Sequence, residues 1–438
     1  MNRDELSLCN IDDLREIAKK RLPRPIFEYI DGAAEDGIAK QHNREVYRSL
    51  KIKNRVLKDV SKRSTATEIF GKKLTMPYAI SPTASAGLMC EGGEVALAKA
   101  AARMGVPCTV ATNALTSLEE IVEAAGGNLW MQLYMWVDKK LRADFVQRIK
   151  SAGFDTLLVT VDGSVGANRE HDRKNGYTMP LRYTPKLIAG VLANPGWCLR
   201  VLAPQYLKRG AFTKANYPPE MSSKLSDKPT DHEMTKPDTQ CWDDIKRIRD
   251  IWPGYMLVKG LQSWEDVVLA ADNGMDGVVL SNHGGRYLDS APAPLQVVPE
   301  VRRAVGDRLK IIIDSGARRG SDIVKAIAMG ADLVMSGRPT LYGAAASGEV
   351  GAYRALEIFQ TEMDRVMAQL GLNRIDEISP HIFWDPPHWV PKPTAAGVAE
   401  QIGARDSTAF AESGATQRNA LISTNDNVIL PALSSSKT

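Results

Sequence analysis

The stretch KIIIDSGARRGSDIVKAIAMGADLVMSGRP, residues 310–339, contains two short apolar runs with a longer helix-like segment between them. The runs Lys310–Ser315 and Asp332–Gly337 are continuously apolar in their interiors, which is typical of parallel strands buried on both faces. Ser321–Met329 lies between them and is followed by Gly330, a residue type that often ends a helix. The stretch therefore predicts one strand-helix-strand unit of a parallel sheet.

Outward from this unit, the same pattern recurs along the chain. Further apolar runs bounded by Gly, Pro or Asp predict strands at Met76–Pro82, Pro107–Thr112, Leu129–Tyr134, Thr156–Asp162, Met256–Gly260 and Gly277–Asn282. Helix-like stretches follow several of them, at Glu94–Met104, Ser117–Ala125, Lys139–Ala152 and Ser263–Asn273. Eight strand-then-helix units favour an α/β fold of the (β/α)8 type, a TIM barrel.

The domain organisation follows from the spacing of these strands. Residues 1–60 are polar and helix-like, and we expect them to form an N-terminal helical segment ahead of a barrel over residues 61–384. The fourth and fifth strands are separated by roughly 100 residues, which predicts a long insertion after strand four, at about 173–240, on the C-terminal rim. Residues 385–438 are rich in Pro, Ala, Ser, Thr and Asn, so we expect a disordered tail.

The composition excludes several classes of protein. Hydrophobic residues make up 44% and charged residues 25% of the 438 residues, which is typical of a soluble globular protein and not of a collagen-like, wholly disordered or disulfide-rich one. The 56 Lys and Arg nearly balance the 52 Asp and Glu, so the net charge of +4 does not indicate nucleic-acid binding. The five cysteines lack the spacing of a zinc or redox site, and no metal site is predicted. With no secretory signal and no apolar run of spanning length, we expect a cytoplasmic protein with reduced thiols.

Two of the predicted strands lead into loops suited to a phosphate group. Asp314–Gly320 and Ser336–Arg338 each combine glycine with arginine, and each opens a helix-like stretch. Glycine lets backbone N–H groups approach an anion, a helix N-terminus favours negative charge, and arginine adds paired hydrogen bonds. Phosphate sites of barrel enzymes recur after strands seven and eight. The alternative interpretation is a pair of ordinary tight turns with solvated arginines.

Polar residues at other strand ends predict an active site. Asp162, Lys259 and His283 lie at the ends of the fourth, fifth and sixth strands, where active-site residues of barrels gather and where burial of an unused charge is costly. His283 and Arg286 share a glycine-rich loop, and a base beside a carboxylate-binding guanidinium suits removal of a proton or hydride from carbon two of a 2-hydroxy acid. A structural histidine capped by Asp162 is the alternative interpretation.

Three motifs resemble those of one known family. SNHGGRYLD at 281–289, IIIDSGARRGSD at 311–322 and SGRPTLYG at 336–343 are similar to the FMN-dependent 2-hydroxy acid dehydrogenase and oxidase family, nearest its (S)-mandelate and L-lactate dehydrogenase branch. The resemblance runs from about residue 12 to 379, interrupted by the insertion. It implies an FMN-binding TIM barrel that oxidises an (S)-2-hydroxy acid such as mandelate or L-lactate to the 2-keto acid. It also implies a homo-oligomer, commonly a tetramer.

The resemblance assigns roles to the residues that match the motifs. His283 corresponds to the catalytic base, Asp162 to the carboxylate that pairs with it, and Arg169 and Arg286 to the two groups that clamp the substrate carboxylate. Tyr29 and Tyr134 correspond to tyrosines whose hydroxyls contact the substrate, and Lys259 to the lysine that would stabilise negative charge on the reduced flavin. The positions implied to surround FMN are Pro82, Thr83, Ala84, Thr112, Gln132, Thr160, Lys259, Ser281, Asp314, Gly316, Arg318, Gly337 and Arg338.

Three positions depart from the family's common pattern. Tyr287 stands where Gln is usual, Thr112 where Ser is common, and Gly163-Ser164 where Thr-Pro is frequent. None of these departures removes a group with an implied catalytic role. They affect the shape of the pocket, and hence the size of the substrate, rather than the reaction.

The predicted insertion has an unusual charge distribution. Residues 173–219 contain eight Lys or Arg and no Asp or Glu, and these bases alternate with apolar and aromatic residues. A basic segment of this kind is typical of an anchor on an anionic membrane surface, and the resemblance implies passage of electrons to a membrane quinone at the inner face of the cell membrane. A mobile lid over the substrate cleft, with solvated basic residues, is the alternative interpretation.

Other functions stay open at this level. Within the family, an oxidase would pass electrons to oxygen and release hydrogen peroxide. Outside it, a different flavin-dependent barrel enzyme or a non-catalytic flavin-binding protein would share the fold and the phosphate site.

Overall fold

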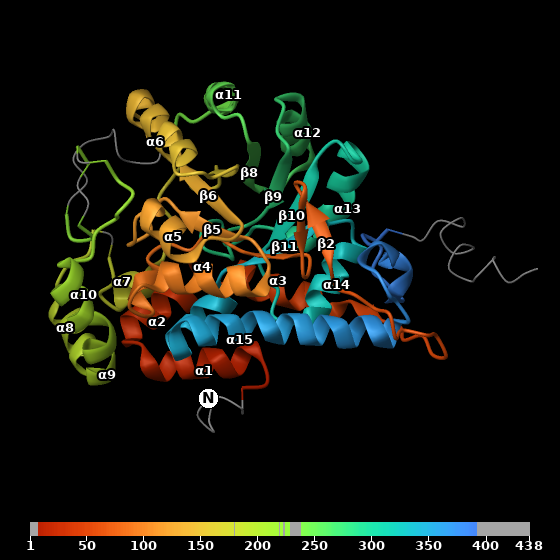
Figure 1. Ribbon diagram of the computed structural model, residues 1–438, viewed down its shortest axis with the longest axis horizontal. Helices are drawn as coiled ribbons and strands as arrows, with labels where there is room; N and C mark the ends of the chain where they lie inside the picture. The colour runs from red at the N-terminus through yellow and green to blue at the C-terminus, as the bar shows by residue number, and fades with distance from the viewer. Residues whose placement is uncertain (1–7, 179, 219, 222–223, 228–237, 392–438) are drawn as a thin grey trace, which may run out of the picture. The chain divides into compact units, whose positions relative to one another are not determined.

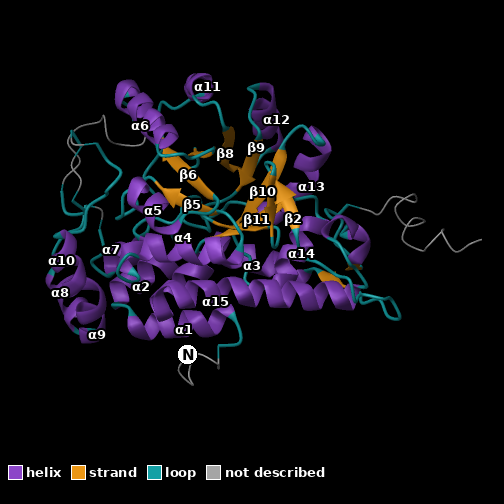
Figure 2. Cartoon of the chain, viewed as in Figure 1, coloured by secondary structure: helices purple, strands orange, loops and turns teal. Residues whose placement is uncertain are grey.

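The centre of the computed structural model is a closed barrel of parallel strands, in the order β10-β11-β4-β5-β6-β7-β8-β9 (Figures 1 and 2). The structure describes residues 8–178, 180–218, 220–221, 224–227 and 238–391. The barrel strands are β4 Tyr78–Ile80, β5 Cys108–Ala111, β6 Leu129–Tyr134, β7 Thr156–Thr160, β8 Tyr255–Leu261, β9 Gly277–Leu280, β10 Lys310–Asp314 and β11 Leu333–Ser336. Each lies within or beside one of the predicted runs, so the predicted TIM barrel is confirmed.

Helices follow the strands and cover the outside of the barrel (Figure 2). Side chains that accept hydrogen bonds from the first turn fix several of their starts, as Ser117 does for α5 and Ser263 for α12. The helices are α4 Gly93–Met104, α5 Leu118–Ala125, α6 Lys139–Ser151, α11 Trp242–Ile251, α12 Trp264–Asp272, α13 Pro294–Val305, α14 Gly320–Ala328 and α15 Arg338–Leu370, the last broken at Ser347 and Gly348.

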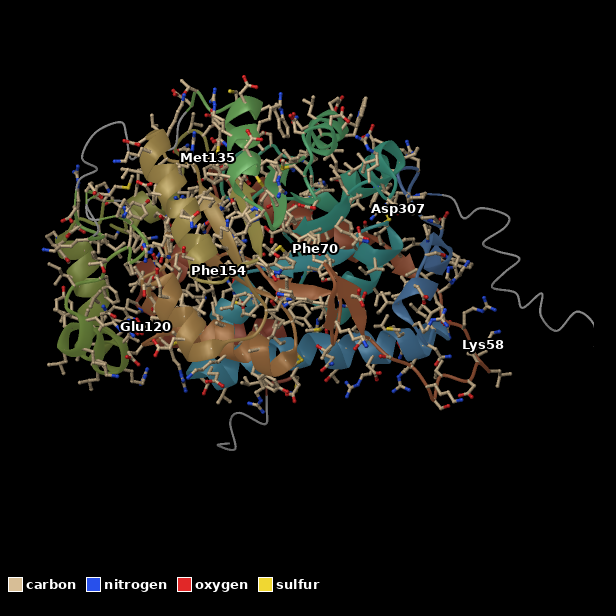
Figure 3. All side chains as sticks on the ribbon, turned by 45° about the horizontal axis from the view of Figure 1, so that its top comes forward. Lys58, Phe70, Glu120, Met135, Phe154 and Asp307 are labelled. Carbon is tan, nitrogen blue, oxygen red and sulfur yellow. The ribbon has the colours of Figure 1, made fainter. Side chains whose placement is uncertain are left out.

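A short hairpin of β2 Thr67–Ile69 and β3 Lys72–Leu74 closes one end of the barrel. Ile69 and Leu74 join the apolar side chains that fill the barrel interior, among them Trp130 and Leu257. Phe70 at the turn, labelled in Figure 3, stacks on Tyr255, with ring centroids 4.5 Å apart. Tyr255 begins β8, so the hairpin covers the N-terminal end and leaves the C-terminal end for a site.

The chain before the barrel forms α1 Ile11–Arg21, α2 Arg24–Asp31 and α3 Ile38–Ser49. β1 Lys51–Ile52 then pairs antiparallel with β12 Phe383–Trp384, which joins the chain that enters the barrel to the chain that follows α15. The disordered tail expected from residue 385 lies mostly outside the described residues.

The insertion is largely helical where it is described. It contains α7 Glu170–Lys174, α8 Pro185–Leu192, α9 Pro195–Trp197, a π-helical turn η3 at Cys198–Leu202, and α10 Ala203–Arg209. The indole N–H of Trp197 donates to the carbonyl of Leu88 over 2.9 Å, and the side-chain amide of Asn216 donates to the carbonyl of Ala111 at the end of β5 over 3.2 Å. These buried bonds fix the insertion to the C-terminal rim.

No single helix among the described residues has the length and apolar character needed to cross a membrane. Pro185–Leu192 together with Pro195–Arg209 would suffice only as a pair bent by 81°.

Candidate functional site

A cavity of about 360 Å³ opens at the C-terminal end of the barrel. Parallel strands deliver the residues that follow them to the same end of a barrel, and the cavity lies where those residues converge. All the site residues predicted from sequence line it except Thr112, Asp162 and Ser281, which lie directly behind lining residues. Those that line it are Tyr29, Pro82, Thr83, Ala84, Gln132, Tyr134, Thr160, Arg169, Lys259, His283, Arg286, Asp314, Gly316, Arg318, Gly337 and Arg338.

His283 is held by its neighbours in one orientation. Its Nδ1 lies 3.0 and 3.1 Å from the two carboxylate oxygens of Asp162, and its backbone N–H donates to Ser281 Oγ over 3.0 Å. The residue has a φ of +55°, a backbone conformation that residues other than glycine rarely adopt. The carboxylate at Nδ1 favours the tautomer with the proton on Nδ1, in which Nε2 carries the lone pair that can accept a proton.

The approach of Asp162 depends on a glycine in β8. A Cβ on Gly260 would lie 2.5 Å from Cβ of Asp162, and Gly260 has a φ of +110°. Glycine alone meets both conditions without strain. The register of β8 shifts at Gly260, and the absence of a side chain at this residue leaves the room that Asp162 needs to reach His283.

A buried ion pair lies beneath the cavity. Lys259 Nζ is 3.2 Å from Asp314 Oδ2, and the hydroxyls of Ser81 and Ser281 donate to the same carboxylate over 2.7 and 2.9 Å. Although burial alone would raise it, Lys259 and these hydroxyls lower the pKa of Asp314. Burial acts to lower the pKa of Lys259, but Asp314 and Asp162 raise it, so the ammonium stays charged.

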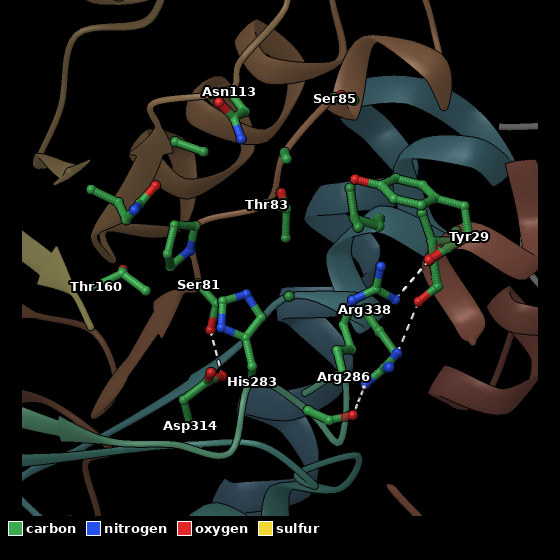
Figure 4. A pocket seen from close by; sticks show the side chains of 18 of the residues that line it. Tyr29, Ser81, Thr83, Ser85, Asn113, Thr160, His283, Arg286, Asp314 and Arg338 are labelled. Atoms are coloured by element: carbon green, nitrogen blue, oxygen red, sulfur yellow. Dashed lines mark hydrogen bonds between the residues drawn. The ribbon is translucent and has the colours of Figure 1, made fainter. Parts of the chain in front are cut away.

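Two guanidinium groups converge beside Tyr29. The guanidinium carbons of Arg286 and Arg169 lie 5.2 and 6.0 Å from the centre of its ring. Arg286 Nη1 donates to the carbonyl of Tyr29 over 2.7 Å (Figure 4). Burial and the charge of Arg169 lower the pKa of Arg286, although Tyr29 and Asp172 act to raise it. Asp172 Oδ2 lies 3.6 Å from Arg169 Nη1, so one carboxylate already partners the pair, and the two guanidinium groups can bind a second one from a ligand.

The loops after β10 and β11 bring Arg318 and Arg338 to the cavity wall. Arg338 lies next to Arg286, since the carbonyl of Gly32 accepts hydrogen bonds from both guanidinium groups. Arg338 donates to the carbonyls of Ile30, Gly284 and Gly32 over 2.9, 3.0 and 2.6 Å. Burial lowers the pKa of Arg338 to about 10. Gly316 and Gly337 line the cavity beside these cations, and a Cβ on Gly316 would lie 2.5 Å from the carbonyl oxygen of Asn43.

The cavity contains buried polar groups that a hydrogen-bonding cofactor would satisfy. Gln132 Nε2 and Thr160 Oγ1 are buried without a hydrogen-bond partner among the described residues, and both residues line the cavity. Orphaned buried polar groups are costly, so a ligand that pairs with them is expected. A Cβ on Gly337 would lie 2.6 Å from Cγ2 of Thr83, which shows how closely the cavity wall is packed there. The polar edges of a flavin and its phosphate match these groups and the arginines.

Several lining residues were not predicted from sequence. Ser81 follows β4 and could have been found from its position alone, whereas Ser315 and Ser336 belong to the two loops predicted to bind a phosphate group. The insertion adds Pro180, Lys214, Leu225 and Asp227. Their loops carry no periodicity that would have signalled a place at the cavity. The cavity is also lined by Ile30, Ser85, Ala111, Asn113, Gly284, Tyr287 and Leu341.

Comparisons with known proteins agree with this geometry. Residues 18–385 match the model of the family described as FMN-dependent dehydrogenase. The (S)-mandelate dehydrogenase of Pseudomonas putida is 37% identical, with 85% of this chain and 93% of that protein covered. A putative L-lactate dehydrogenase of Mycobacterium tuberculosis is 39% identical over 84% of this chain and 87% of the relative.

Solved structures show the same similarity. A crystal structure described as the monotopic membrane protein (S)-mandelate dehydrogenase superposes with a TM-score of 0.80 at 36% identity, covering 87% of this chain and 100% of that one. A mandelate oxidase variant with (S)-mandelic acid reaches a TM-score of 0.71 at 30% identity, covering 84% of this chain and 96% of that one.

Proposed function

Because the chain belongs to the FMN-dependent dehydrogenase family and is an FMN-dependent 2-hydroxy acid dehydrogenase, we propose that His283 is the base that takes a proton from the substrate. One observation carries this assignment: His283 lines the cavity beside Arg169 and Arg286, with Asp162 at its Nδ1. Asp162 accepts the Nδ1–H hydrogen bond and stabilises the imidazolium that forms when Nε2 gains the proton.

The two arginines hold the substrate by its carboxylate in this proposal. A carboxylate between Arg169 and Arg286 relieves the repulsion between them and places carbon two near His283. Tyr29 and Tyr134 line the same cavity, and in this proposal their hydroxyls hold the substrate hydroxyl.

FMN, when bound, accepts the two electrons that leave carbon two of the substrate. In our proposal, Lys259 and Ser281, with Pro82, Thr83, Ala84, Thr112, Gln132 and Thr160, would hold its ring system. Asp314, Gly316, Arg318, Gly337 and Arg338 would hold its ribityl chain and phosphate. The raised pKa of Lys259 keeps a positive charge in the barrel interior, where it stabilises negative charge on a neighbouring group.

We propose an (S)-2-hydroxy acid of the mandelate or L-lactate type as substrate. The purified yellow protein is mixed without oxygen with L-lactate and with (S)-mandelate, and the flavin absorbance is followed. Bleaching by either acid supports the proposal, and the faster acid identifies the preferred substituent. A flavin that neither acid bleaches would contradict it. Slow recovery of colour on admission of air supports a dehydrogenase, and fast recovery supports the oxidase alternative.

We further propose that the protein is cytoplasmic and attaches to the inner face of the cell membrane through its insertion, where a quinone receives the electrons. Leu192, Leu199 and Leu207 on α8, η3 and α10 are 69, 72 and 87% exposed. Basic residues such as Lys186 and Lys208 lie on the same helices. A surface with apolar and basic side chains suits the boundary of an anionic bilayer. The monotopic relative supports this proposal.

A further inference from the structure

Tyr287 touches the catalytic machinery at two points although its residue type departs from the family pattern. It follows His283 on the loop after β9, where Gly284 and Gly285, with φ of +69° and +75°, turn the chain. The turn brings the Tyr287 ring back onto His283, with ring centroids 4.9 Å apart and an angle of 77° between the planes. An edge-on contact of this kind favours one orientation of both rings.

The hydroxyl of Tyr287 is hydrogen-bonded to the hydroxyl of Tyr134. Tyr134 ends β6, and its backbone N–H donates to Thr112 Oγ1 over 3.1 Å, so its main chain is fixed. A phenol has one proton and two lone pairs, and its partner decides where that proton points. A hydrogen bond with Tyr287 therefore restricts the directions in which the Tyr134 hydroxyl can point.

Tyr287 lies between the base and the carboxylate clamp. Its ring contacts that of His283, and the charged groups that act on its hydroxyl include Asp162, Arg169 and Arg286. Burial and Asp162 raise its pKa, and burial raises the pKa of Tyr134 well above its ordinary value. Both phenols are therefore neutral at physiological pH and keep the proton that the hydrogen bond needs.

We propose that Tyr287 is a positioning residue for hydroxy acid oxidation in this chain, orienting the hydroxyl of Tyr134 and holding the His283 ring against Asp162. This inference rests on the proposed roles of His283 and Tyr134. It assigns one function to the hydroxyl of Tyr287 and another to its ring, and the two can be removed separately.

Two variants separate these functions. Tyr287→Phe removes the hydroxyl alone, and we expect flavin reduction at saturating substrate to slow roughly 10-fold, as for the loss of one oriented hydrogen bond. Its pH midpoint should stay as in the wild type. Tyr287→Leu also removes the ring. We expect the rate of flavin reduction to fall roughly 100-fold, because a small displacement of a catalytic group can lower a rate by that factor. Tyr183→Phe, at a 62% exposed position in the insertion, is the matched control.

Binding provides a readout independent of turnover. A 2-hydroxy acid with a methyl group in place of the hydrogen on carbon two cannot be oxidised, and its affinity is measured from the change in the flavin spectrum. We expect Tyr287→Phe to bind it within about twofold of the wild type, since the arginines still hold the carboxylate. Weaker binding with an unchanged rate at saturation would make Tyr287 a binding residue and overturn the inference.

The outcomes distinguish this inference from the proposed function. If both Tyr287 variants reduce the flavin within about twofold of the wild-type rate while His283→Ala does not, Tyr287 has no positioning role and the proposed function stands. If His283→Ala reduces the flavin normally, the proposed function fails and the inference fails with it. Should Tyr287→Leu not fold, the rate and binding of Tyr287→Phe decide the question.

Discussion

The ion pair of Lys259 and Asp314 carries two charges into the interior of the barrel. Each charge is compensated by the other. Removal of one partner would leave an unpaired buried charge, which is strongly destabilising. The pair also leaves a positive charge facing the cavity, which is where the proposed reaction needs it. Stability and catalysis thus depend on the same two side chains.

Lys259→Met tests this dependence through the effect of pH on stability. The pKa of wild-type Asp314 is lower in the folded protein than in the unfolded chain. Its carboxylate therefore stabilises the fold at pH values above the unfolded-state pKa, and this stabilisation is lost as the pH falls through the folded-state pKa. In the variant, burial without a cation raises that pKa, so the carboxylate destabilises the fold as pH rises. We expect the difference in unfolding free energy to widen from about pH 4 to pH 7 and to reach about 3 kcal/mol.

Denaturant unfolding of the flavin-free proteins measures this difference. Lys310→Met is the control, because Lys310 pairs with Asp332 at the surface and its side chain is 48% exposed. A loss of stability in Lys259→Met that does not change with pH would show that Asp314 does not depend on Lys259.

Arg286→Lys tests the carboxylate clamp. A lysine keeps the charge but cannot reproduce the fork of a guanidinium, and it would also lose the bond to the carbonyl of Tyr29. We expect kcat/KM to fall roughly 30-fold, which corresponds to a loss of about 2 kcal/mol of transition-state stabilisation, with FMN content unchanged. Steady-state kinetics with the preferred acid measures the fall, and Arg24→Lys, an exposed arginine paired with Glu28, is the control. If Arg286→Lys has the same kcat/KM as the wild type, Arg286 does not bind the substrate carboxylate.

Single residues of the site could be placed from sequence where they follow a buried strand. Lys259, His283 and Asp314 were found in this way, because parallel strands of a barrel end at one rim. The contacts of Tyr287 could not be predicted from sequence, because the positive φ angles of Gly284 and Gly285 determine where its ring lies. Lys214 was missed because no strand precedes it.

At the scale of elements, short segments escaped prediction although they decide where the site lies. The β2 and β3 strands have three residues each, too few to produce a recognisable alternation. Their hairpin nevertheless closes the N-terminal end of the barrel. The barrel strands, by contrast, were predicted although several are as short, because the apolar runs that contain them are continuous and bounded by Gly, Pro or Asp. The helices α4, α5, α6, α12 and α14 were predicted as well, whereas α11, α13 and α15 were not.

The β11–α15 junction offers a test at this scale. Gly337 has a φ of −102°, which alanine tolerates, so Gly337→Ala acts only through the clash of its Cβ with Thr83 Cγ2. We expect the displaced Thr83 to weaken FMN binding by about 1–3 kcal/mol, measured as the flavin retained after dialysis. Adding Thr83→Ser removes Cγ2 and should restore part of the flavin.

Gly166→Ala, at a position with open space around it, is the control for Gly337→Ala. Full flavin retention in Gly337→Ala would mean that the junction does not shape the cofactor site.

At the scale of the whole molecule, the barrel supplies the chemistry and the insertion supplies a surface. The insertion reaches the cavity through Lys214 and Asp227 and presents exposed leucines on α8 to α10. Figure 1 shows these helices grouped beside α2 and α7, which carry Tyr29 and the residues after Arg169. One segment thus joins the proposed membrane surface to the substrate site.

Co-sedimentation with vesicles tests this arrangement. We expect the wild type to bind anionic vesicles, and the triple variant Leu192→Ser, Leu199→Ser, Leu207→Ser to stay in solution with full flavin reduction. Each leucine contributes about 1.5–3 kcal/mol when its side chain leaves water. Leu57→Ser, at a fully exposed position outside the insertion, should bind as the wild type does. Wild-type protein that remains in solution at low salt would refute membrane attachment.

The most direct test of the central claim is the rate at which a 2-hydroxy acid bleaches the flavin of His283→Ala. The acid that reduces the wild type faster is mixed with the variant in the absence of oxygen. We predict that the variant retains its FMN colour and is reduced about 10²–10⁴ times more slowly, which is the contribution of a positioned base. Reduction at a rate near that of the wild type would contradict the assignment of His283 and the mechanism built on it.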